Sequence, residues 1–274
     1  MKAAMYYNQH DIRLEEVPTP QISDDEILVE MKACGICGSD LMGWYLESRA
    51  PLVLGHEPSG VVVKKGSKVS SLEVGDRVFV HHHVACLTCH YCLHGDYTLC
   101  TKFHETNIRP GGFSEYFRVP ASNVQIDTLK IPDDLSFEDA TFVEPVGCCL
   151  RALKKCGVQV GDTVAIIGAG ATGLIHSALS KIYGAGTTIV SDLIDFRLKF
   201  AGRFGADITV NPRNQNFAEV VTKETDGRGV DLAIVTAPNL EAYKTGMSIC
   251  RKGGKLCVFA PTNPESYLQL SPRD

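Results

Sequence analysis

The sequence predicts an α/β protein in which a β-rich first half is followed by a doubly wound parallel sheet. Two patterns support this fold class. Up to about residue 130, short apolar runs are separated by turn residues, and after about residue 160, strand-like runs alternate with stretches of helical length. We therefore expect two domains, residues 1–150 and residues 151–274.

The first half has the pattern of short strands. Val29–Ala33 alternates apolar and polar residues with period two, as a half-buried strand does. Val61–Val63 and Arg77–Val80 are further β-branched runs, and Gly66-Ser67 and Gly75-Asp76 supply turn residues beside them. This half is predicted to form a compact β-rich barrel.

Helices are expected from about residue 135 onward. Ser136 begins a capping-box pattern, so a helix should start there. Pro145 disfavours helical geometry at Glu144, and we expect the helix to break at that point. A second helix is predicted over residues 146–156, with Gly157 as its C-terminal stop.

The second half alternates strands with helices. The predicted strands are Thr163–Ile167, Thr187–Ser191, Asp207–Val210, Asp231–Val235 and Lys255–Ala260. Stretches between them, such as Leu174–Tyr183 and Phe196–Phe204, have helical length and spacing. Such alternation implies a parallel sheet with helices on both faces.

Composition excludes several classes of protein. Of the 274 residues, 44% are hydrophobic and 22% are charged, which argues against disorder. A net charge of −5 lacks the basic footprint of a nucleic-acid binder. No apolar run approaches the ~18 residues of a membrane span, and the N-terminus turns polar too soon for a secretory signal. We expect a soluble cytoplasmic protein with neither nucleic-acid nor membrane partners.

A glycine-rich turn, Gly168–Gly173, directly follows the first strand of the second half. Gly168 permits a sharp turn, Gly170 lets the backbone approach a pyrophosphate, and Gly173 lets the helix pack against the strand. The phosphates would then bind the free N–H groups of the helix N-terminus. A purely structural turn is the alternative, but the strand–turn–helix context predicts a dinucleotide site that includes Thr172.

Asp192 ends the next predicted strand, twenty-four residues after Gly168. A carboxylate there accepts hydrogen bonds from the ribose hydroxyls of the adenosine and repels a 2′-phosphate, which favours NAD over NADP. We also assign Arg197 to the cofactor site. The alternative is a surface aspartate at a strand end.

Four of the eleven cysteines form the most specific local motif, Cys86, Cys89, Cys92 and Cys100. Thiolates at these intervals can close a tetrahedron around a structural zinc ion within a lobe of residues 84–102. An iron–sulfur cluster is the competing interpretation, but its fourth cysteine comes sooner and precedes proline, whereas Thr101 follows here. Unligated thiols are the third. In a reducing compartment, clustered cysteines of this kind indicate a metal site rather than disulfides.

A second metal site is predicted from distant residues: Cys37, His56, Glu57 and Glu144. Taken singly, each has an ordinary explanation as a buried or solvated side chain. Together, cysteine, histidine and carboxylate with one position open are what a catalytic zinc ion requires. The neighbouring run His81–His83 is not expected to bind metal, because three consecutive strand residues cannot face one ion.

The motifs occur in one order along nearly the whole chain: Gly55–Gly60 with Gly66 and Val69, Val74–Val78, the cysteine lobe, Gly111–Tyr116, Glu144-Pro145 and the glycine-rich turn. This order resembles the zinc-dependent medium-chain alcohol dehydrogenases, particularly their polyol (sorbitol) and threonine dehydrogenase branch. The resemblance implies that Cys37, His56 and Glu144 hold a catalytic zinc ion, with Glu57 as an exchangeable fourth ligand or a supporting carboxylate. Glutamate at 144, where ethanol-type enzymes have cysteine, indicates the polyol branch.

The resemblance also implies a GroES-like catalytic domain and a Rossmann NAD-binding domain with the cofactor between them. The reaction would move a hydride from a secondary alcohol, polyol-like or amino-alcohol, to NAD. Ser39 would begin the proton relay and Asp40 would support the zinc site. Met42 stands where relatives often have histidine, so we expect water to complete the relay. Cys148 and Cys149 are rival candidates for the third zinc ligand.

The chain ends soon after the fifth predicted strand, whereas a complete dinucleotide-binding sheet has six. We therefore expect the last strand and the return segment to be absent, and a homo-oligomer would have to form without the strand that pairs subunits in relatives. Two hypotheses follow: a zinc- and NAD-dependent dehydrogenase of a small-molecule alcohol, or a non-catalytic zinc- and nucleotide-binding fragment. A zinc-independent reductase is disfavoured because it would not need Cys37, His56 and Glu144.

Overall fold

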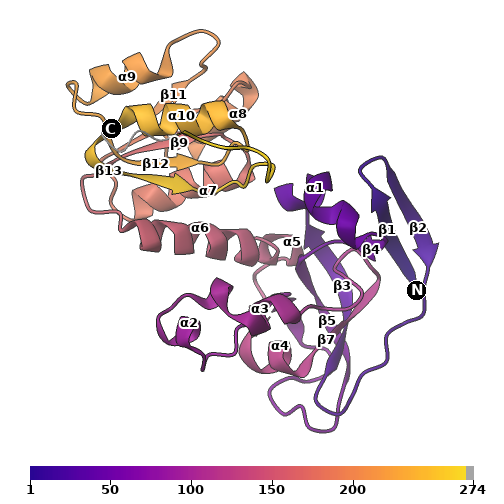
Figure 1. Cartoon of the computed structure of the whole chain (residues 1–274). Helices are drawn as coiled ribbons and strands as arrows, with labels where there is room; N and C mark the ends of the chain where they lie inside the picture. The colour runs from indigo at the N-terminus through magenta and orange to yellow at the C-terminus, as the bar shows by residue number, and fades with distance from the viewer. Residues whose placement is uncertain (270–274) are drawn as a thin grey trace. The chain divides into compact units, whose positions relative to one another are not determined.

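The structure of the protein is a computed structural model that describes residues 1–269 (Figure 1). The chain divides into two compact units. Unit 1 spans Met1–Glu144, and unit 2 begins at Pro145. Residues 270–274 of the predicted second domain lie outside the described residues.

Unit 1 contains two antiparallel sheets, with strand orders β2-β1-β4 and β7-β3-β5-β6-β8. Its strands are β1 (Lys2–Asn8), β2 (Asp11–Glu16), β3 (Ile27–Gly35), β4 (Leu52–Val53), β5 (Glu57–Lys65), β6 (Arg77–Val80), β7 (Tyr116–Val119) and β8 (Thr128–Lys130). Its helices are η1 (Gly38–Leu41), α1 (Gly43–Leu46), η2 (Glu47–Arg49), α2 (His90–Leu93), η3 (Tyr97–Leu99), α3 (Thr101–Glu105), α4 (Ala121–Ile126) and α5 (Phe137–Ala140).

The largest core cluster of unit 1 is built on the larger sheet. Val29 of the central strand β3 pairs with Val62 of β5 on one side and with Phe117 of β7 on the other, and all three side chains are fully buried. These are the inward positions of the period-two pattern, so hydrophobic burial sets the register of the three strands. The β-rich character predicted for this half is confirmed.

Two predictions concern the helices at the end of unit 1; the first is confirmed and the second is wrong. Ser136 caps α5 as expected, because its Oγ accepts the N–H of Asp139 at 2.9 Å. The expected break at Glu144 is wrong, since α6 runs over Val143–Cys156 and includes both Glu144 and Pro145. Proline is tolerated in a first turn, where the missing N–H would have no partner within the helix.

Unit 2 is built on a five-stranded parallel sheet of order β11-β10-β9-β12-β13. Its strands are β9 (Thr163–Ile167), β10 (Thr187–Ser191), β11 (Ile208–Val210), β12 (Val230–Val235) and β13 (Cys250–Val258). Its helices are α6, α7 (Ala171–Ile182), α8 (Asp195–Arg203), α9 (Phe217–Glu224) and α10 (Leu240–Ile249). The prediction of a parallel α/β sheet is confirmed.

Helices cover both faces of this sheet (Figure 1). Ala165 and Ile167 of the central strand β9 belong to the core beneath α9 and α10, whereas Val164 and Ile166 belong to the core that contacts α7 and α8. Every residue of β9 is buried. A parallel strand buried on both faces needs a continuous apolar run, which explains why β9 was readily predicted.

The last described strand begins earlier than predicted. β13 starts at Cys250 rather than at Lys255, and its pairing with β12 changes register between Val230 and Leu232. Gly253 and Gly254 lie at this irregularity, and glycine is depleted in strands, so the first part of the strand was not predicted.

Asp231 joins three strands at the edge of the sheet where β12 begins. Its carboxylate accepts the N–H of Thr163 at 2.8 Å and hydrogen bonds from Arg251 at 2.5 Å and Arg228 at 3.0 Å. Burial disfavours the charged form, but the bonds from Arg251, Thr163 and Arg228 outweigh it and lower the pKa of Asp231 from 3.8 to about 2.

Asp231→Asn is expected to lower the free energy of unfolding by about 1–2 kcal/mol at pH 7. A carboxylate whose pKa is depressed by folding stabilises the protein above its unfolded pKa. The difference between the variant and the native chain should therefore shrink as the pH falls from about 4 toward 2. Urea unfolding at several pH values measures it, with exposed Asp226→Asn as the control. A loss that is equal at every pH would contradict this role.

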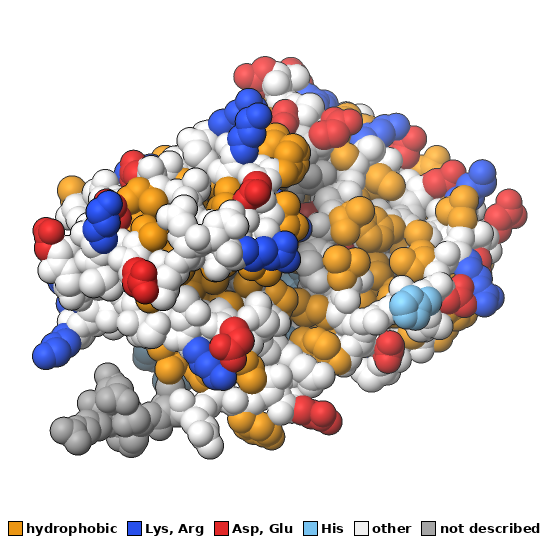
Figure 2. All heavy atoms as spheres, turned by 90° about the horizontal axis from the view of Figure 1, so that it is seen from above, with side chains coloured by type: hydrophobic (Ala, Val, Ile, Leu, Met, Phe, Trp, Pro, Cys, Tyr) orange, Lys and Arg blue, Asp and Glu red, His pale blue; other side chains and the backbone are white. Residues whose placement is uncertain are grey.

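One face of the surface shows no dominant charge. On the face drawn in Figure 2, acidic and basic side chains are interspersed and neither sign forms a large patch. Among residues 1–269, no helix combines the length and the apolar character needed to cross a bilayer.

Candidate metal centre and cofactor site

Three of the predicted metal-binding residues come together in unit 1. One donor atom from each of Cys37, His56 and Glu57 lies within 4.8 Å of the other two. Cys37 directly precedes η1, His56 directly precedes β5, and Glu57 is the first residue of β5. A thiol, an imidazole and a carboxylate are donor types that zinc accepts in catalytic sites, where a further position stays open. The residues therefore fit a zinc ion.

A glycine on the neighbouring strand makes room for Glu57. Glu57 pairs with Gly35 in the β3–β5 ladder, and a Cβ atom at position 35 would lie 1.8 Å from Oε2 of Glu57. Glu57 is only 6% exposed, and burial together with the nearby Glu144 raises its pKa to about 7. Because its surroundings disfavour the charged form, the carboxylate of Glu57 would be strongly stabilised by a neighbouring cation.

Asp40 supports the same group from η1. Its Oδ2 accepts the N–H of Cys37 at 3.0 Å, and its Oδ1 lies 3.5 Å from Nδ1 of His56. Burial opposes a charge on His56, but Asp40 and Cys37 outweigh it and raise its pKa to about 11. With Nδ1 held by a carboxylate, Nε2 is the ring nitrogen that remains for a metal. Ser39 lies beside Asp40 in η1 and is partly exposed.

Glu144 lies in a different group from Cys37. One of its oxygens is within 4.8 Å of a ring nitrogen of both His81 and His82. The expectation that the run His81–His83 binds no metal stays a prediction, although two of its rings come together here. It assumed strand geometry, but β6 ends at Val80, so the period-two alternation stops there. His83 behaves differently, because its Nδ1 contacts the carbonyl oxygen of Thr106.

The two rival cysteines lie on α6 in unit 2. Cys148 is exposed, whereas Cys149 is buried and its Sγ donates to the carbonyl of Thr172 at 3.7 Å. Within residues 1–269, neither belongs to a group of three metal-binding side chains.

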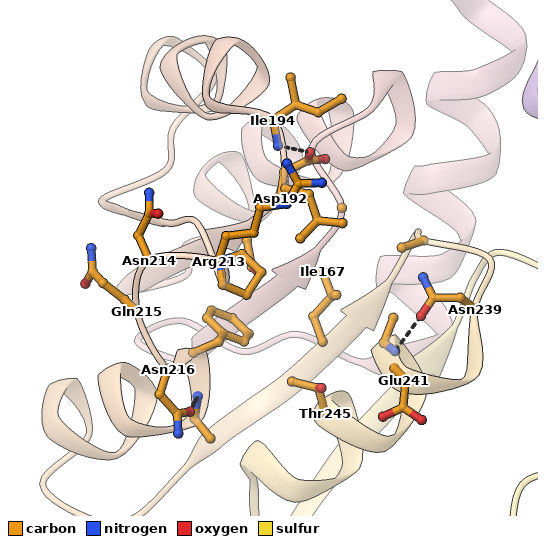
Figure 3. A pocket seen from close by; sticks show the side chains of 18 of the residues that line it. Ile167, Asp192, Ile194, Arg213, Asn214, Gln215, Asn216, Asn239, Glu241 and Thr245 are labelled. Atoms are coloured by element: carbon orange, nitrogen blue, oxygen red, sulfur yellow. Dashed lines mark hydrogen bonds between the residues drawn. The ribbon is translucent and has the colours of Figure 1, made fainter.

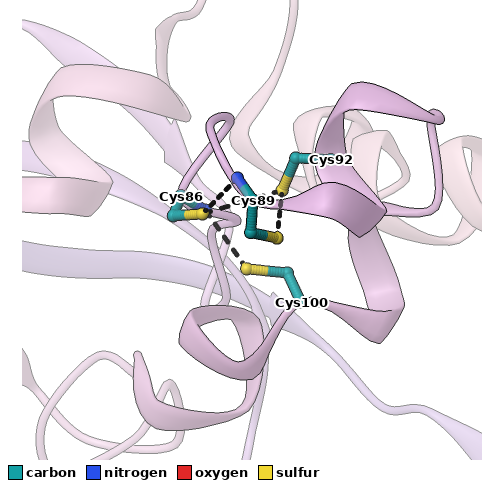
Figure 4. A group of neighbouring side chains, drawn as sticks. All are labelled: Cys86, Cys89, Cys92 and Cys100. Carbon is teal, nitrogen blue, oxygen red and sulfur yellow. Dashed lines mark hydrogen bonds between the residues drawn. The ribbon is translucent and has the colours of Figure 1, made fainter.

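The four cysteines of the lobe form a compact sulfur cluster (Figure 4). Their Sγ atoms all lie within 4.8 Å of one another, with Cys89 and Cys92 at 3.5 Å and Cys86 and Cys92 at 3.9 Å. Main-chain N–H groups of Cys89 and Cys86 point at the sulfurs of Cys86 and Cys100, at 3.3 and 3.4 Å. Four thiolates in this arrangement fit a closed zinc site with no position for substrate.

A cavity of 910 Å³ opens at the carboxyl ends of the parallel strands in unit 2 (Figure 3). Asp192 and Arg197 line it, as does Gly168, whereas Gly170, Thr172 and Gly173 are not part of its lining. Ligands of doubly wound sheets bind at this edge. The cavity is large enough for part of a dinucleotide.

Asp192 is held firmly in this cavity. Its Oδ2 accepts the N–H of Ala169 at 2.7 Å and its Oδ1 accepts the N–H of Ile194 at 2.9 Å. Arg197 Nη1 lies 3.6 Å from the same carboxylate, whose side chain is 7% exposed. The carboxylate therefore stands at a fixed position where the glycine-rich turn meets the end of β10.

The glycine-rich turn has the geometry that the sequence predicted. Gly168 has φ of +111°, and a Cβ atom at Gly173 would lie 1.9 Å from the carbonyl oxygen of Gly168. A Cβ atom at Gly170 would meet open space within 4 Å. The backbone at Gly170 is thus accessible at the N-terminus of α7, as the binding of a phosphate group requires.

Sequence reasoning missed several polar residues of the cavity, among them Arg213, Asn214 and Asn239. They follow the ends of β11 and β12, and Asn239 also caps α10 by accepting the N–H of Ala242 at 2.9 Å. Their position just beyond the carboxyl ends of two parallel strands is the signal that could have identified them.

Comparison with known proteins agrees with the fold and the site. Residues 23–133 match the family model of the alcohol dehydrogenase GroES-like domain, and residues 171–274 match that of the zinc-binding dehydrogenases. The chain is 39% identical over 280 residues to a sorbitol dehydrogenase from Bacillus subtilis, covering 98% of this chain and 78% of that protein.

Solved structures give the same result. A 2R,3R-butanediol dehydrogenase from Bacillus subtilis superposes with a TM-score of 0.84 at 30% identity, covering 99% of this chain and 80% of the other. A zinc-binding dehydrogenase from Sinorhizobium meliloti, bound to NADP, superposes with a TM-score of 0.89 at 31% identity, covering 99% and 80%.

Fold and site together define a zinc-dependent oxidoreductase that uses a nicotinamide cofactor. The chain belongs to the zinc-dependent medium-chain alcohol dehydrogenase family, in its polyol dehydrogenase branch.

Proposed function

We propose that the protein oxidises a secondary alcohol of the polyol type, with NAD as hydride acceptor and two zinc ions per chain. In this proposal unit 1 is the catalytic domain and unit 2 holds the cofactor. The observation that carries it is the convergence of Cys37, His56 and Glu57 from separate elements. The clustered thiols of the cysteine lobe support a reducing compartment such as the cytoplasm.

The catalytic zinc would be held by Cys37, His56 and Glu57. The family resemblance implies Glu144 as a further ligand, and Glu144 lies close enough to Glu57 to raise the pKa of its carboxyl group. A zinc ion bound there supplies positive charge that lowers the pKa of an alcohol hydroxyl. Cys86, Cys89, Cys92 and Cys100 would hold the second, structural ion.

Two residues beside the metal group have roles in this proposal: one receives the hydroxyl proton, and the other holds the zinc ligands in position. A nicotinamide held by unit 2 would supply the acceptor for the hydride of the alcohol carbon, and the hydroxyl proton would have to leave separately. Ser39, two residues after Cys37, is our candidate for receiving that proton. Asp40 acts as a positioning residue, because it fixes the main chain of Cys37 and the ring of His56.

The test combines metal analysis with a steady-state assay. After dialysis into metal-free buffer, we expect about two zinc ions per chain and NADH formation with at least one member of a polyol panel. One zinc ion per chain, without turnover on any secondary alcohol, would instead support the alternative of a non-catalytic zinc- and nucleotide-binding fragment.

The native chain is expected to bind NADH at least about tenfold more tightly than NADPH. The fixed carboxylate of Asp192 would accept hydrogen bonds from ribose hydroxyls and repel a 2′-phosphate. Asp192→Ala should reduce the ratio of the NADPH dissociation constant to the NADH dissociation constant. Titration of the variant with each cofactor measures it.

Asp207→Ala provides a matched control for that measurement. Asp207 also accepts a main-chain N–H, that of Thr188 at 2.7 Å, but it lies at the opposite end of β10. Its removal should leave the preference unchanged. Tighter NADPH binding by the native chain would refute the role of Asp192.

A further inference from the structure

Two half-buried cysteines of unit 2 lie side by side although they come from distant parts of the sequence. Cys156 is the last residue of α6, and Cys257 lies near the end of β13. Both side chains pack against the core cluster on one face of the sheet, which includes Leu153 of α6 and Ile234 of β12. Cys257 pairs with Ile234 in the β12–β13 ladder, and Leu153 lies about one turn before Cys156. The end of α6 and the end of β13 therefore meet at this core.

Two contacts connect these segments directly. Nζ of Lys255 donates to the carbonyl oxygen of Cys156 at 2.5 Å. Lys255 lies two residues before Cys257 on β13, and strand residues at this spacing point to the same side of a sheet. The thiol of Cys257 itself donates a hydrogen bond to the sulfur of Cys156. The two sulfur atoms are therefore direct neighbours, and the ammonium group of Lys255 lies beside Cys156.

These contacts give the two thiols different reactivity. The hydrogen bond from Cys257 outweighs the effect of burial and, together with the charge of Lys255, lowers the pKa of Cys156 to about 7. The same hydrogen bond and burial raise the pKa of Cys257, so this residue stays a neutral thiol. A thiolate is the nucleophile in thiol–disulfide exchange, and a neighbouring thiol can resolve the mixed disulfide that forms.

We propose that Cys156 is a modification site for low-molecular-weight disulfides and that Cys257 resolves the product into a disulfide between α6 and β13. The thiolate of Cys156 attacks one sulfur of the small disulfide, whose S–S bond breaks and releases one thiolate. Cys257 gives its proton to that thiolate and attacks the sulfur of Cys156, which releases the second half of the small molecule as a thiolate. The two cysteines lose two electrons, and the small disulfide is reduced to one thiol and one thiolate.

Two other cysteines on the same elements provide a comparison. Cys250 begins β13, its Sγ donates to the carbonyl of Gly246 at 3.1 Å, and burial raises its pKa. Cys149 of α6 is buried, and its Sγ donates to the carbonyl of Thr172 at 3.7 Å. Both act as hydrogen-bond donors, which requires the protonated and less nucleophilic form of the thiol. Modification should therefore select Cys156.

Peptide mapping of the zinc-loaded full chain tests the proposal. The chain is incubated with glutathione disulfide at pH 7, its remaining thiols are blocked with iodoacetamide, and trypsin digestion is carried out without reductant. Cleavage after Lys155 and after Lys255 separates the proposed pair from Cys149 and Cys250. We expect one cross-linked pair of peptides, which joins the two proposed cysteines, and a zinc content equal to that of the untreated chain.

Three variants separate the two steps. Cys257→Ser should keep one glutathione as a mixed disulfide on Cys156 and form no cross-link. Cys156→Ser should consume glutathione disulfide at least about tenfold more slowly than the native chain, because the attacking thiolate is gone. Cys250→Ser is the matched control on the same strand, and it should form the native cross-link at the native rate.

A further measurement on the native chain does not require any variant to fold. Iodoacetamide at pH 7 should label Cys156 at least about tenfold faster than Cys257. Equal labelling rates, glutathione that accumulates first on another cysteine, or the absence of the cross-link in the native chain would overturn the proposal. Neither cysteine belongs to a metal-binding group of the described residues, so these readouts do not depend on the proposed reaction.

Discussion

Cys37→Ser is expected to lower kcat/KM for the alcohol by about 10³-fold or more, a loss of roughly 4 kcal/mol of transition-state stabilisation. A serine hydroxyl does not supply the thiolate that holds the ion with His56 and Glu57. The dissociation constant of NADH should change less than about threefold, because the cavity in unit 2 contains no part of this group. Steady-state kinetics, NADH titration and zinc analysis of the same preparation measure the three quantities.

Cys34→Ser is the matched control for this experiment. Cys34 lies three residues earlier, and its Sγ donates to the carbonyl of Gly35 at 3.6 Å. Burial raises the pKa of Cys34 to about 12, so it remains a neutral thiol, and it lies outside the metal-binding groups of the described residues. Its replacement should preserve both zinc ions and turnover. Full activity of Cys37→Ser would remove the proposed catalytic site.

Cys100→Ser is expected to remove the zinc ion from the cysteine lobe and to unfold the lobe. The lobe has a core made largely of sulfur: the buried side chains are Ala85, Cys92 and Cys100, with Phe103 packed against them. Leu93 is 74% exposed and adds little to this core. Without the metal ion, little buried apolar surface would remain to keep the lobe folded. Structural zinc ions contribute on the order of 10 kcal/mol to the folding of comparably small motifs. The expected local loss is therefore large.

Two measurements check this second prediction. Zinc content should fall by one ion per chain. Chymotrypsin should cut the lobe at Tyr91, Leu93 or Tyr97 faster than in the native chain, where we expect the fixed backbone of the lobe to slow cleavage. Cys250→Ser, which removes a thiol outside both zinc groups, should keep two zinc ions and the native cleavage pattern. Unchanged zinc content in Cys100→Ser would show that the four sulfurs do not form a metal site.

Local spacing made several features predictable. The cysteine motif, the glycine-rich turn and the buried strands β9 and β10 each occupy a short segment, and their residue types alone limit the conformations available. The parallel sheet followed from the alternation of such segments. The predicted helix break at Glu144 was wrong. The residue before a proline disfavours helical geometry only weakly, and α6 places Pro145 in its first turn, where proline is tolerated.

The sequence by itself determined the family, the fold class and the kinds of donor atoms available to metals, because these depend on residue type and on spacing along the chain. Only the tertiary structure decided which donors meet. It grouped Glu57 with Cys37 and His56, and it placed Glu144 beside His81 and His82. The physical reason is that contacts between distant segments depend on where each strand ends and on how the chain turns after it. β6, for example, ends at Val80, directly before the histidines. No local sequence pattern encodes that geometry.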